Sequence, residues 1–278
     1  EIKSEAGIIN SVGYENLSYN VDLAINNGKN KVNGVGEIGK LLIFGEELND
    51  INTNFRIRDD ILYIDNFYNN SLTLNGYYNI RAKSLDIKYN IKNYEIERTS
   101  LLKGTDITGF ITELSGELSG SIKAPYIKTE ILKAEISYGK FQKLKLNGEV
   151  EYIDKKIKFE NLKVNQNMLN GEYNIDTGEI EGKINIFESE VQKYLGVSDI
   201  TFRTIGELNF WGNISDLKGT TEITVDNLYY KDKKLPVLYT KLNFNKLNLN
   251  NFMESGIFNF NSIKVINSKK KSVVEGTG

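Results

Sequence analysis

The sequence predicts an all-β protein, an elongated, repeat-built antiparallel sheet that curves into an open groove and carries two short helices. Three observations lead to this fold class. Apolar and polar residues alternate along most of the 278-residue chain, turn-forming residues separate the alternating segments, and a long stretch of sequence recurs further along. The composition agrees, because 16 Tyr and 13 Phe with only two Pro favour strands.

The alternation first appears over 17–25, where apolar residues occupy every second position. Comparable segments cover 51–57, 85–91, 144–152, 184–186, 223–225 and 242–244. Each segment presents one apolar and one polar face, as expected for an antiparallel sheet that is solvated on one side. The turn residues lie at 26–28, 58–60, 153–156, 176–179 and 231–234, and they predict a long meander of hairpins.

Two stretches depart from this pattern and predict short helices. Over 93–102 and 188–195, apolar residues are spaced by about three or four positions. Gly104 and Gly196 follow these stretches, and glycine is common just beyond the end of a helix. We therefore expect a helix of one or two turns in each stretch.

The sequence repeats internally. Residues 74–80 read Leu-Asn-Gly-Tyr-Tyr-Asn-Ile and return at 169–175 as Leu-Asn-Gly-Glu-Tyr-Asn-Ile, a shift of 95 residues (169 − 74). A second motif, Gly-Glu followed by Leu or Ile, begins at Gly36, Gly116 and Gly206. We expect one elongated domain over 1–278, a fragment of a larger protein, with units at about 1–31 (partial), 32–113, 114–203 and 204–278 (incomplete).

The repeat is too large for a coil of a β-helix, and it lacks the motifs of propeller blades. What remains is a sheet that grows by hairpins and keeps its apolar residues on one face. Too little helix is predicted to cover that face. Because strands twist, we expect the sheet to bend into a trough around its own apolar face.

The composition excludes several kinds of active site. The chain has no His and no Cys, so a Ser-His-Asp site, a Cys-His site or a Cys/His metal site cannot form within it. No Walker-type or Gly-x-Ser-x-Gly motif occurs, and the carboxylate pairs at 46–47 and 59–60 lie where solvation explains them. The net charge of −2 offers no broad basic surface for nucleic acid, and the lysines at 269–271 indicate a solvated strand end. We expect no enzyme activity, no cofactor and no metal.

The motifs resemble a known family. The Gly-Glu-Leu openings at Gly116 and Gly206 precede long alternating strands, and the Leu-Asn-Gly-x-Tyr segments begin at Leu74 and Leu169. This arrangement resembles the AsmA-like envelope proteins, in particular the TamB family of translocation and assembly module subunits. The resemblance spans essentially the whole chain. It rests on the periodic recurrence of these segments rather than on an invariant motif.

This resemblance implies a parent protein that is anchored in the inner membrane and crosses the periplasm as a β-taco with a hydrophobic groove. It implies that phospholipid acyl chains are carried between the inner and outer membranes, in support of outer-membrane biogenesis. It also implies an outer-membrane partner of the Omp85 class, bound through a region of the parent outside this chain. Eukaryotic bridge-like lipid transfer proteins are similar in design.

Alternation alone selects the residues that would line such a groove, so the opposite face stays open for any single strand. The selected residues are Phe55, Ile57, Leu85, Ile87, Leu144, Leu146, Val150, Ile157, Phe159, Ile184, Ile186, Ile223, Val225, Leu242 and Phe244. Two other functions remain open at this point. One is a structural or adhesive cell-surface stalk with a dry core, and the other is a periplasmic chaperone that offers sheet edges to outer-membrane proteins.

Overall fold

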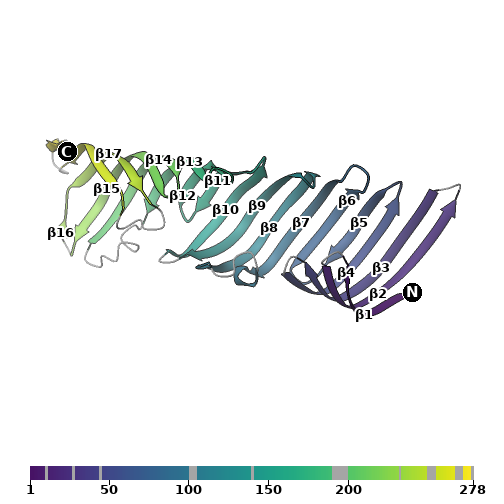
Figure 1. The fold of residues 1–278 in the computed structure, drawn as a ribbon. Helices are drawn as coiled ribbons and strands as arrows, with labels where there is room; N and C mark the ends of the chain where they lie inside the picture. Colours follow the sequence, from purple (N-terminus) through teal and green to yellow (C-terminus); the bar gives the residue numbers. More distant parts are fainter. Residues whose placement is uncertain are drawn as a thin grey trace. The chain divides into compact units, whose positions relative to one another are not determined.

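The computed structural model describes residues 1–9, 12–26, 29–43, 46–99, 105–138, 141–189, 200–231, 233–248, 255–266 and 272–276. Nearly all of these residues lie in antiparallel strands that belong to one open sheet (Figure 1). The predicted all-β, antiparallel fold class is therefore confirmed.

The chain divides into two compact units. The first contains 1–147 and 151–154, and the second contains 148–150 and 155–278. Each unit is built from strands that pair with their neighbours in the sequence, which is the arrangement expected of a meander.

In the first unit, β1 to β9 pair in chain order, and every pair is antiparallel (Figure 1). Its strands are β1 (Ile2–Ile9), β2 (Val12–Asn26), β3 (Lys29–Ile43), β4 (Glu46–Arg58), β5 (Ile61–Tyr68), β6 (Leu72–Asn79), β7 (Ser84–Glu95), β8 (Ile107–Ser121) and β9 (Ala124–Tyr138). Strand β10 (Phe141–Ile153) pairs with β9.

In the second unit, β11 to β15 also pair in chain order. Strand β15 pairs with both the two-residue β16 and β17, and β18 and β19 follow. The strands are β11 (Lys156–Val164), β12 (Asn167–Asn174), β13 (Glu179–Ser189), β14 (Ile200–Asn213), β15 (Asp216–Tyr230), β16 (Lys233–Lys234), β17 (Val237–Leu247), β18 (Ile257–Ile266) and β19 (Ser272–Gly276).

Two hairpin turns have the same backbone at positions 95 residues apart. Asp59 and Asp60 have φ values of 48° and 64°, and Asp154 and Lys155 have 48° and 63°. Positive φ at both central residues is the geometry of a type I′ turn, whose twist matches that of the flanking strands. The shift that aligns the sequence thus also aligns these turns.

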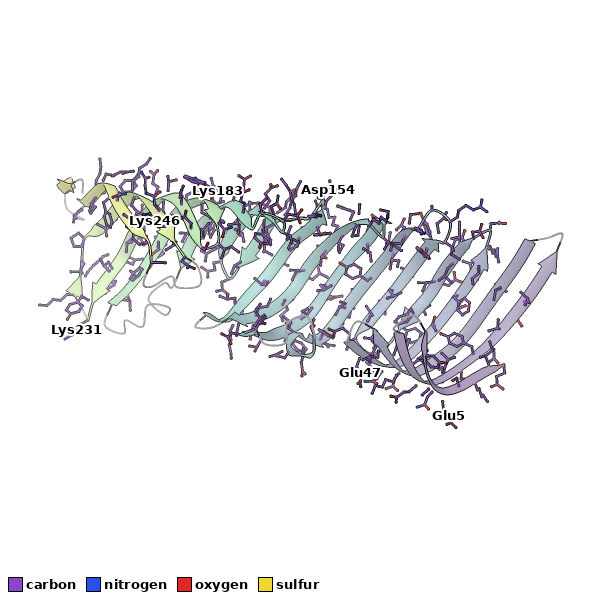
Figure 2. The ribbon with its side chains drawn as sticks, in the orientation of Figure 1. Glu5, Glu47, Asp154, Lys183, Lys231 and Lys246 are labelled. Carbon is purple, nitrogen blue, oxygen red and sulfur yellow. The ribbon has the colours of Figure 1, made fainter. Side chains whose placement is uncertain are left out.

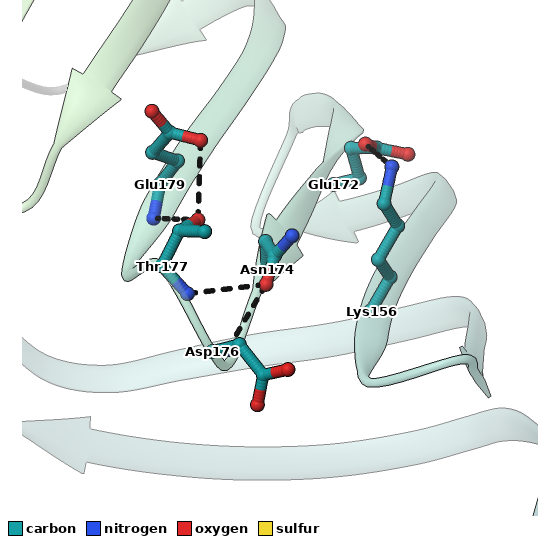
Figure 3. Close-up of polar contacts among 6 residues, drawn as sticks. All are labelled: Lys156, Glu172, Asn174, Asp176, Thr177 and Glu179. Atoms are coloured by element: carbon teal, nitrogen blue, oxygen red, sulfur yellow. Dashed lines mark hydrogen bonds and ion pairs between the residues drawn. The ribbon is translucent and has the colours of Figure 1, made fainter. Parts of the chain in front are cut away.

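The turns that follow β6 and β12 are equivalent too. Asn79 accepts a hydrogen bond from the backbone of Ala82, and Asn174 accepts from Asp176 and Thr177 (Figure 3). An Asn side chain that bonds to the backbone two or three residues on stabilises a turn of this kind.

The ion pair beside these turns is conserved in position and reversed in charge. Arg81 Nη2 lies 2.9 Å from Asp60 Oδ2, and Lys155 Nζ lies 2.8 Å from Asp176 Oδ2. Residues 60 and 81 correspond to 155 and 176 under the 95-residue shift. The two units therefore use the same local geometry with different side chains.

The first expected helix begins later than predicted and is one turn long. Strand β7 continues to Glu95, and only Ile96–Arg98 form a 3₁₀ turn, η1, which ends at Thr99. Of the one- to two-turn helix predicted over 93–102, the described part contains this single turn, while Tyr94 and Glu95 pair with β8. Of the second expected helix, 188–189 belong to β13, and the rest lies outside the described residues.

Each unit has a small buried cluster. In the first unit it contains Ile38, Leu41 and Ile51, and Ile51 has no exposed surface. In the second unit it contains Leu217, Phe244 and Leu247. Both clusters draw on neighbouring strands, and every described element except η1 is a strand of the sheet.

Candidate functional site

The pairing register assigns the side chains of the first unit to two faces. Partners across an antiparallel pair point to the same side, and successive residues point to opposite sides. One row of partners crosses β4 to β9, and it consists of Phe55, Ile64, Gly76, Ile87, Leu118 and Ile127. We call the side of this row the apolar face and the other side the polar face; side chains stand on both sides of the ribbon in Figure 2.

The second unit has an equivalent row. It crosses β11 to β15, β17 and β18, and it consists of Phe159, Gly171, Gly182, Phe210, Gly219, Phe244 and Phe258. The apolar face of the second unit is the side of this row. Residues one position along each strand, such as Lys158, Glu172 and Lys183, point to the polar face.

The structure places the predicted lining residues on this face within each unit. Phe55, Ile57, Leu85 and Ile87 lie on the apolar face of the first unit. In the second unit the residues on this face are Ile157, Phe159, Ile184, Ile186, Ile223, Val225, Leu242 and Phe244.

The remaining three predicted residues occupy alternate positions of β10. Glu151 follows Val150 and accepts a hydrogen bond of 3.0 Å from Tyr126, which neighbours Ile127 in β9 and faces the other side. Val150 therefore points to the side of Ile127, and alternation assigns Leu144 and Leu146 to the same side.

The lining residues are incompletely covered. Phe244 is buried, whereas the other fourteen are only partly buried. A side chain in a closed core contacts neighbours on all sides and is seldom exposed. The apolar face therefore keeps part of its surface available in both units.

Tyrosines on the apolar face were not selected from the sequence, and they share one arrangement. Tyr89 is paired with Gly116, and its hydroxyl reaches Thr129 on the next strand at 2.5 Å. A Cβ added to Gly116 would meet the Tyr89 hydroxyl at 2.5 Å, so the ring lies directly over the glycine. Burial raises the pKa of the Tyr89 hydroxyl above its ordinary value, and the hydrogen bond with Thr129 acts in the opposite direction.

The same arrangement occurs near the start of the chain. Tyr19 is paired with Gly36, which is paired with Thr53, and burial raises the pKa of Tyr19 while a hydrogen bond to Thr53 lowers it. Phenylalanine rings lie over glycine in the same way at Gly34 beneath Phe55 and at Gly219 beneath Phe244. Each of these rings occupies the space that a glycine leaves on the neighbouring strand.

The Gly-Glu-Leu motif is the sequence signal for this packing. Gly116 and Gly206 lie under side chains of neighbouring strands, and the Leu that follows two residues later points to the apolar face. The intervening Glu points to the polar face, where Glu117 lies 3.8 Å from Lys88 and Glu207 lies 2.5 Å from Lys183. The three residues of the motif thus have separate roles. The Gly lets a neighbouring strand or side chain come close, the Glu places a charge on the polar face, and the Leu adds an apolar side chain to the apolar face.

The polar face carries charge pairs of both signs. The Lys183 ammonium, labelled in Figure 2, lowers the pKa of the Glu207 carboxyl through a hydrogen bond, and the Arg203 guanidinium does the same for Asp226. Arg56 binds Asp65 through two hydrogen bonds of 2.5 and 2.6 Å. These ion pairs are largely solvated, so they keep the polar face hydrated and add little to the free energy of unfolding.

In the part of the chain that the structure describes, no group of three or more acidic residues is arranged to hold a metal ion. The described helical residues contain no segment that is long and apolar enough to cross a membrane. Comparison of the chain with protein-family models, with curated proteins and with solved structures returns no match.

Proposed function

We propose that this chain is a segment of a β-groove that carries phospholipids, with the acyl chains lying along the apolar face. The observation that supports this proposal is the register of the sheet. In each unit, consecutive strands present apolar residues to one side, and most of these residues remain partly exposed.

Partition supplies the free energy of binding in this proposal. Transfer of an acyl chain from water to an apolar surface gains about 0.8 kcal/mol for each CH₂ group buried. A chain of about 16 carbons therefore gains on the order of 10 kcal/mol if most of it is covered. The headgroup stays in water, so no single residue has to recognise the lipid.

The resemblance to the TamB and AsmA-like family extends the proposal to the cell. The groove would lie in the periplasm as part of a protein anchored in the inner membrane, and it would carry lipid toward the outer membrane. An Omp85-class protein would be its outer-membrane partner, through a part of the parent outside this chain. The chain itself would perform no catalysis.

A stalk with a dry core is the alternative, and one observation favours it locally. Ile51 has no exposed surface, and Leu217 is 3% exposed, so both clusters are already closed around these residues. If the whole apolar face closed in this way, it would support a rod and hold no lipid.

Two isoleucines in the second unit give a matched test. Ile223 is paired with Gly206 on the apolar face, whereas Ile205 is paired with Thr224 and points to the polar face. A photoreactive phenylalanine analogue at position 223 should crosslink to phospholipid in cells, and the same analogue at 205 should not. Lipid extraction and mass spectrometry of the crosslinked protein identify the adduct.

Substitution to aspartate adds a second readout. The Ile223→Asp protein should lose most of the phospholipid that co-purifies with the parent chain, while its β-sheet circular dichroism persists. Ile205→Asp should retain the lipid. Equal crosslinking at the two positions, or a lipid-free parent chain, would contradict the groove and favour the dry-core stalk.

A further inference from the structure

The single tryptophan of the chain lies on the face that the proposed lipid does not use. Trp211 belongs to β14, between Phe210 and Gly212, both of which point to the apolar face. Trp211 itself is paired with Glu181 on one side and Lys218 on the other, and it is 45% exposed. More than half of this residue is covered, and the rest of its large apolar ring stands open among charged side chains.

A shallow hollow of about 740 Å³ lies against this tryptophan. Its lining takes polar-face residues from two adjacent rows, among them Lys158, Glu172, Glu181, Lys183, Asn209 and Trp211. The row between them, Phe159, Gly171, Gly182 and Phe210, also lines it. Polar-face residues on both sides of this middle row line the hollow, whereas the neighbouring apolar-face residues Leu169, Ile184 and Leu208 do not, which places the hollow on the polar face. Its volume is within the range of small-ligand sites, roughly 300–1,000 Å³.

A second hollow adjoins the first and shares three residues with it, Glu172, Glu181 and Trp211. Lys156, Asn174 and Glu179 extend its lining toward the turn between β12 and β13 (Figure 3). The two hollows together form a polar surface on which Trp211 is the aromatic residue that points to the polar face.

Two carboxylates face each other in this surface. Glu172 and Glu181 are directly opposed across β12 and β13, an arrangement that destabilises a sheet through like-charge repulsion. Lys156 reaches Glu172 at 2.6 Å, and Glu181 makes no hydrogen bond to another residue that the structure describes. The Glu181 carboxylate is therefore an acceptor that a ligand can reach.

The charges around the tryptophan nearly cancel. Three lysines, Lys156, Lys158 and Lys183, are set against four glutamates, Glu160, Glu172, Glu179 and Glu181. Such a surface offers no net attraction to a phosphate or a nucleic acid backbone. It suits a neutral ligand that brings many hydroxyl groups.

We propose that this surface binds a neutral oligosaccharide, with a pyranose ring stacked on the indole of Trp211. The axial C–H bonds of a sugar ring carry partial positive charge, which the negative face of an aromatic ring attracts. The hydroxyls at the ring edge donate to Glu181 and to the Asn209 amide oxygen, because charged acceptors form the stronger hydrogen bonds. The Asn209 amide nitrogen already donates to Glu207, which fixes the direction of its oxygen.

Tryptophan emission from the whole chain tests this assignment, because the sequence contains one Trp. Titration with chitotetraose or cellotetraose should change the emission in a saturable way, with a dissociation constant on the order of 1 mM or lower. Glu181→Gln and Asn209→Ala should each weaken binding by about five- to tenfold. Glu222→Gln is the matched control, since Glu222 lies on β15 outside both hollows.

Isothermal titration calorimetry provides the readout for Trp211→Ala, which should abolish the heat of binding while the circular dichroism stays unchanged. The proposal is overturned if neither sugar gives a saturable response in the folded chain. It is equally overturned if Glu181→Gln and Asn209→Ala respond like the Glu222→Gln control. An emission change with phospholipid vesicles and none with sugar would assign the face to lipid instead.

Discussion

At the scale of single residues, the glycines of the Gly-Glu-Leu motif determine how close neighbouring side chains come to the sheet. A Cβ at Gly116 would meet the Lys128 carbonyl oxygen and the Tyr89 hydroxyl. The first of these atoms is backbone and cannot move without disturbing the pairing of β8 with β9. Glycine is therefore required at this position for space, even though its backbone is that of an ordinary strand.

Gly116→Ala should destabilise the first unit by about 1–3 kcal/mol, because overpacking displaces a ring or a strand. The urea midpoint, followed by circular dichroism, measures the change. Gly13→Ala is the control, since its new Cβ would contact only Leu42, at an ordinary 3.4 Å. If the two alanine variants unfolded at the same midpoint, the close packing of Tyr89 over Gly116 would be wrong.

At the scale of elements, the type I′ turns explain why several loops could be predicted from the sequence alone. Asp and Lys are tolerated at positive φ, but Asn followed by Gly adopts this turn with less strain. The turn at Asp154 and Lys155 therefore carries strain that a different dipeptide would relieve. The exposed ion pair of Lys155 with Asp176 contributes little to set against this.

Replacing this turn by Asp154→Asn with Lys155→Gly should raise stability by about 0.5–1.5 kcal/mol, because two residues no longer hold an unfavourable φ. Thermal unfolding of the double variant gives the measurement. Lys155→Ala is the matched control, as it removes the ion pair without relieving the backbone. A midpoint for the double variant below that of the control would show that the turn has another geometry.

The strands and turns could be predicted because period-two alternation and turn residues are local signals. The stretch at 93–102 could not, because Asn93 has a φ of 51° inside β7. A residue with positive φ interrupts the alternation, so that Ile91 and Tyr94 are three positions apart within one strand. Asn16 and Asp50 have the same backbone in β2 and β4. An interruption of this kind produces helical spacing within a strand.

The residues of the apolar face could be predicted from the sequence about as well as the strands. Alternation selected residues such as Ile87 and Ile223, but it could not select Tyr19 or Tyr89, whose hydroxyl groups have partners two strands away. It also gave no reason to single out Trp211, because the hollow beside it is assembled from four strands. The register of the sheet and the shape of a pocket depend on which strands pair and how they are aligned, and a single sequence does not determine this.

At the scale of the whole molecule, strands pair with their neighbours along the chain, and the two buried clusters belong to different units. Stability in such an array is approximately a sum of local terms and neighbour contacts. A core substitution should therefore act near its own position in the sequence. This is the opposite of a globular core, where one cavity weakens the whole domain.

Ile51→Ala tests this locality. Ile51 has no exposed surface and contacts the Ile38 and Leu41 cluster, so its truncation should cost about 2–5 kcal/mol in the first unit. Hydrogen exchange should lose protection in β2 to β5, while β12 to β17 keep the protection of the parent chain. Phe244→Ala is the reciprocal variant, because Phe244 belongs to the cluster of the second unit. Loss of protection in both units from either variant would mean that the chain unfolds as one cooperative body, and the repeat-array account of its stability would then be wrong.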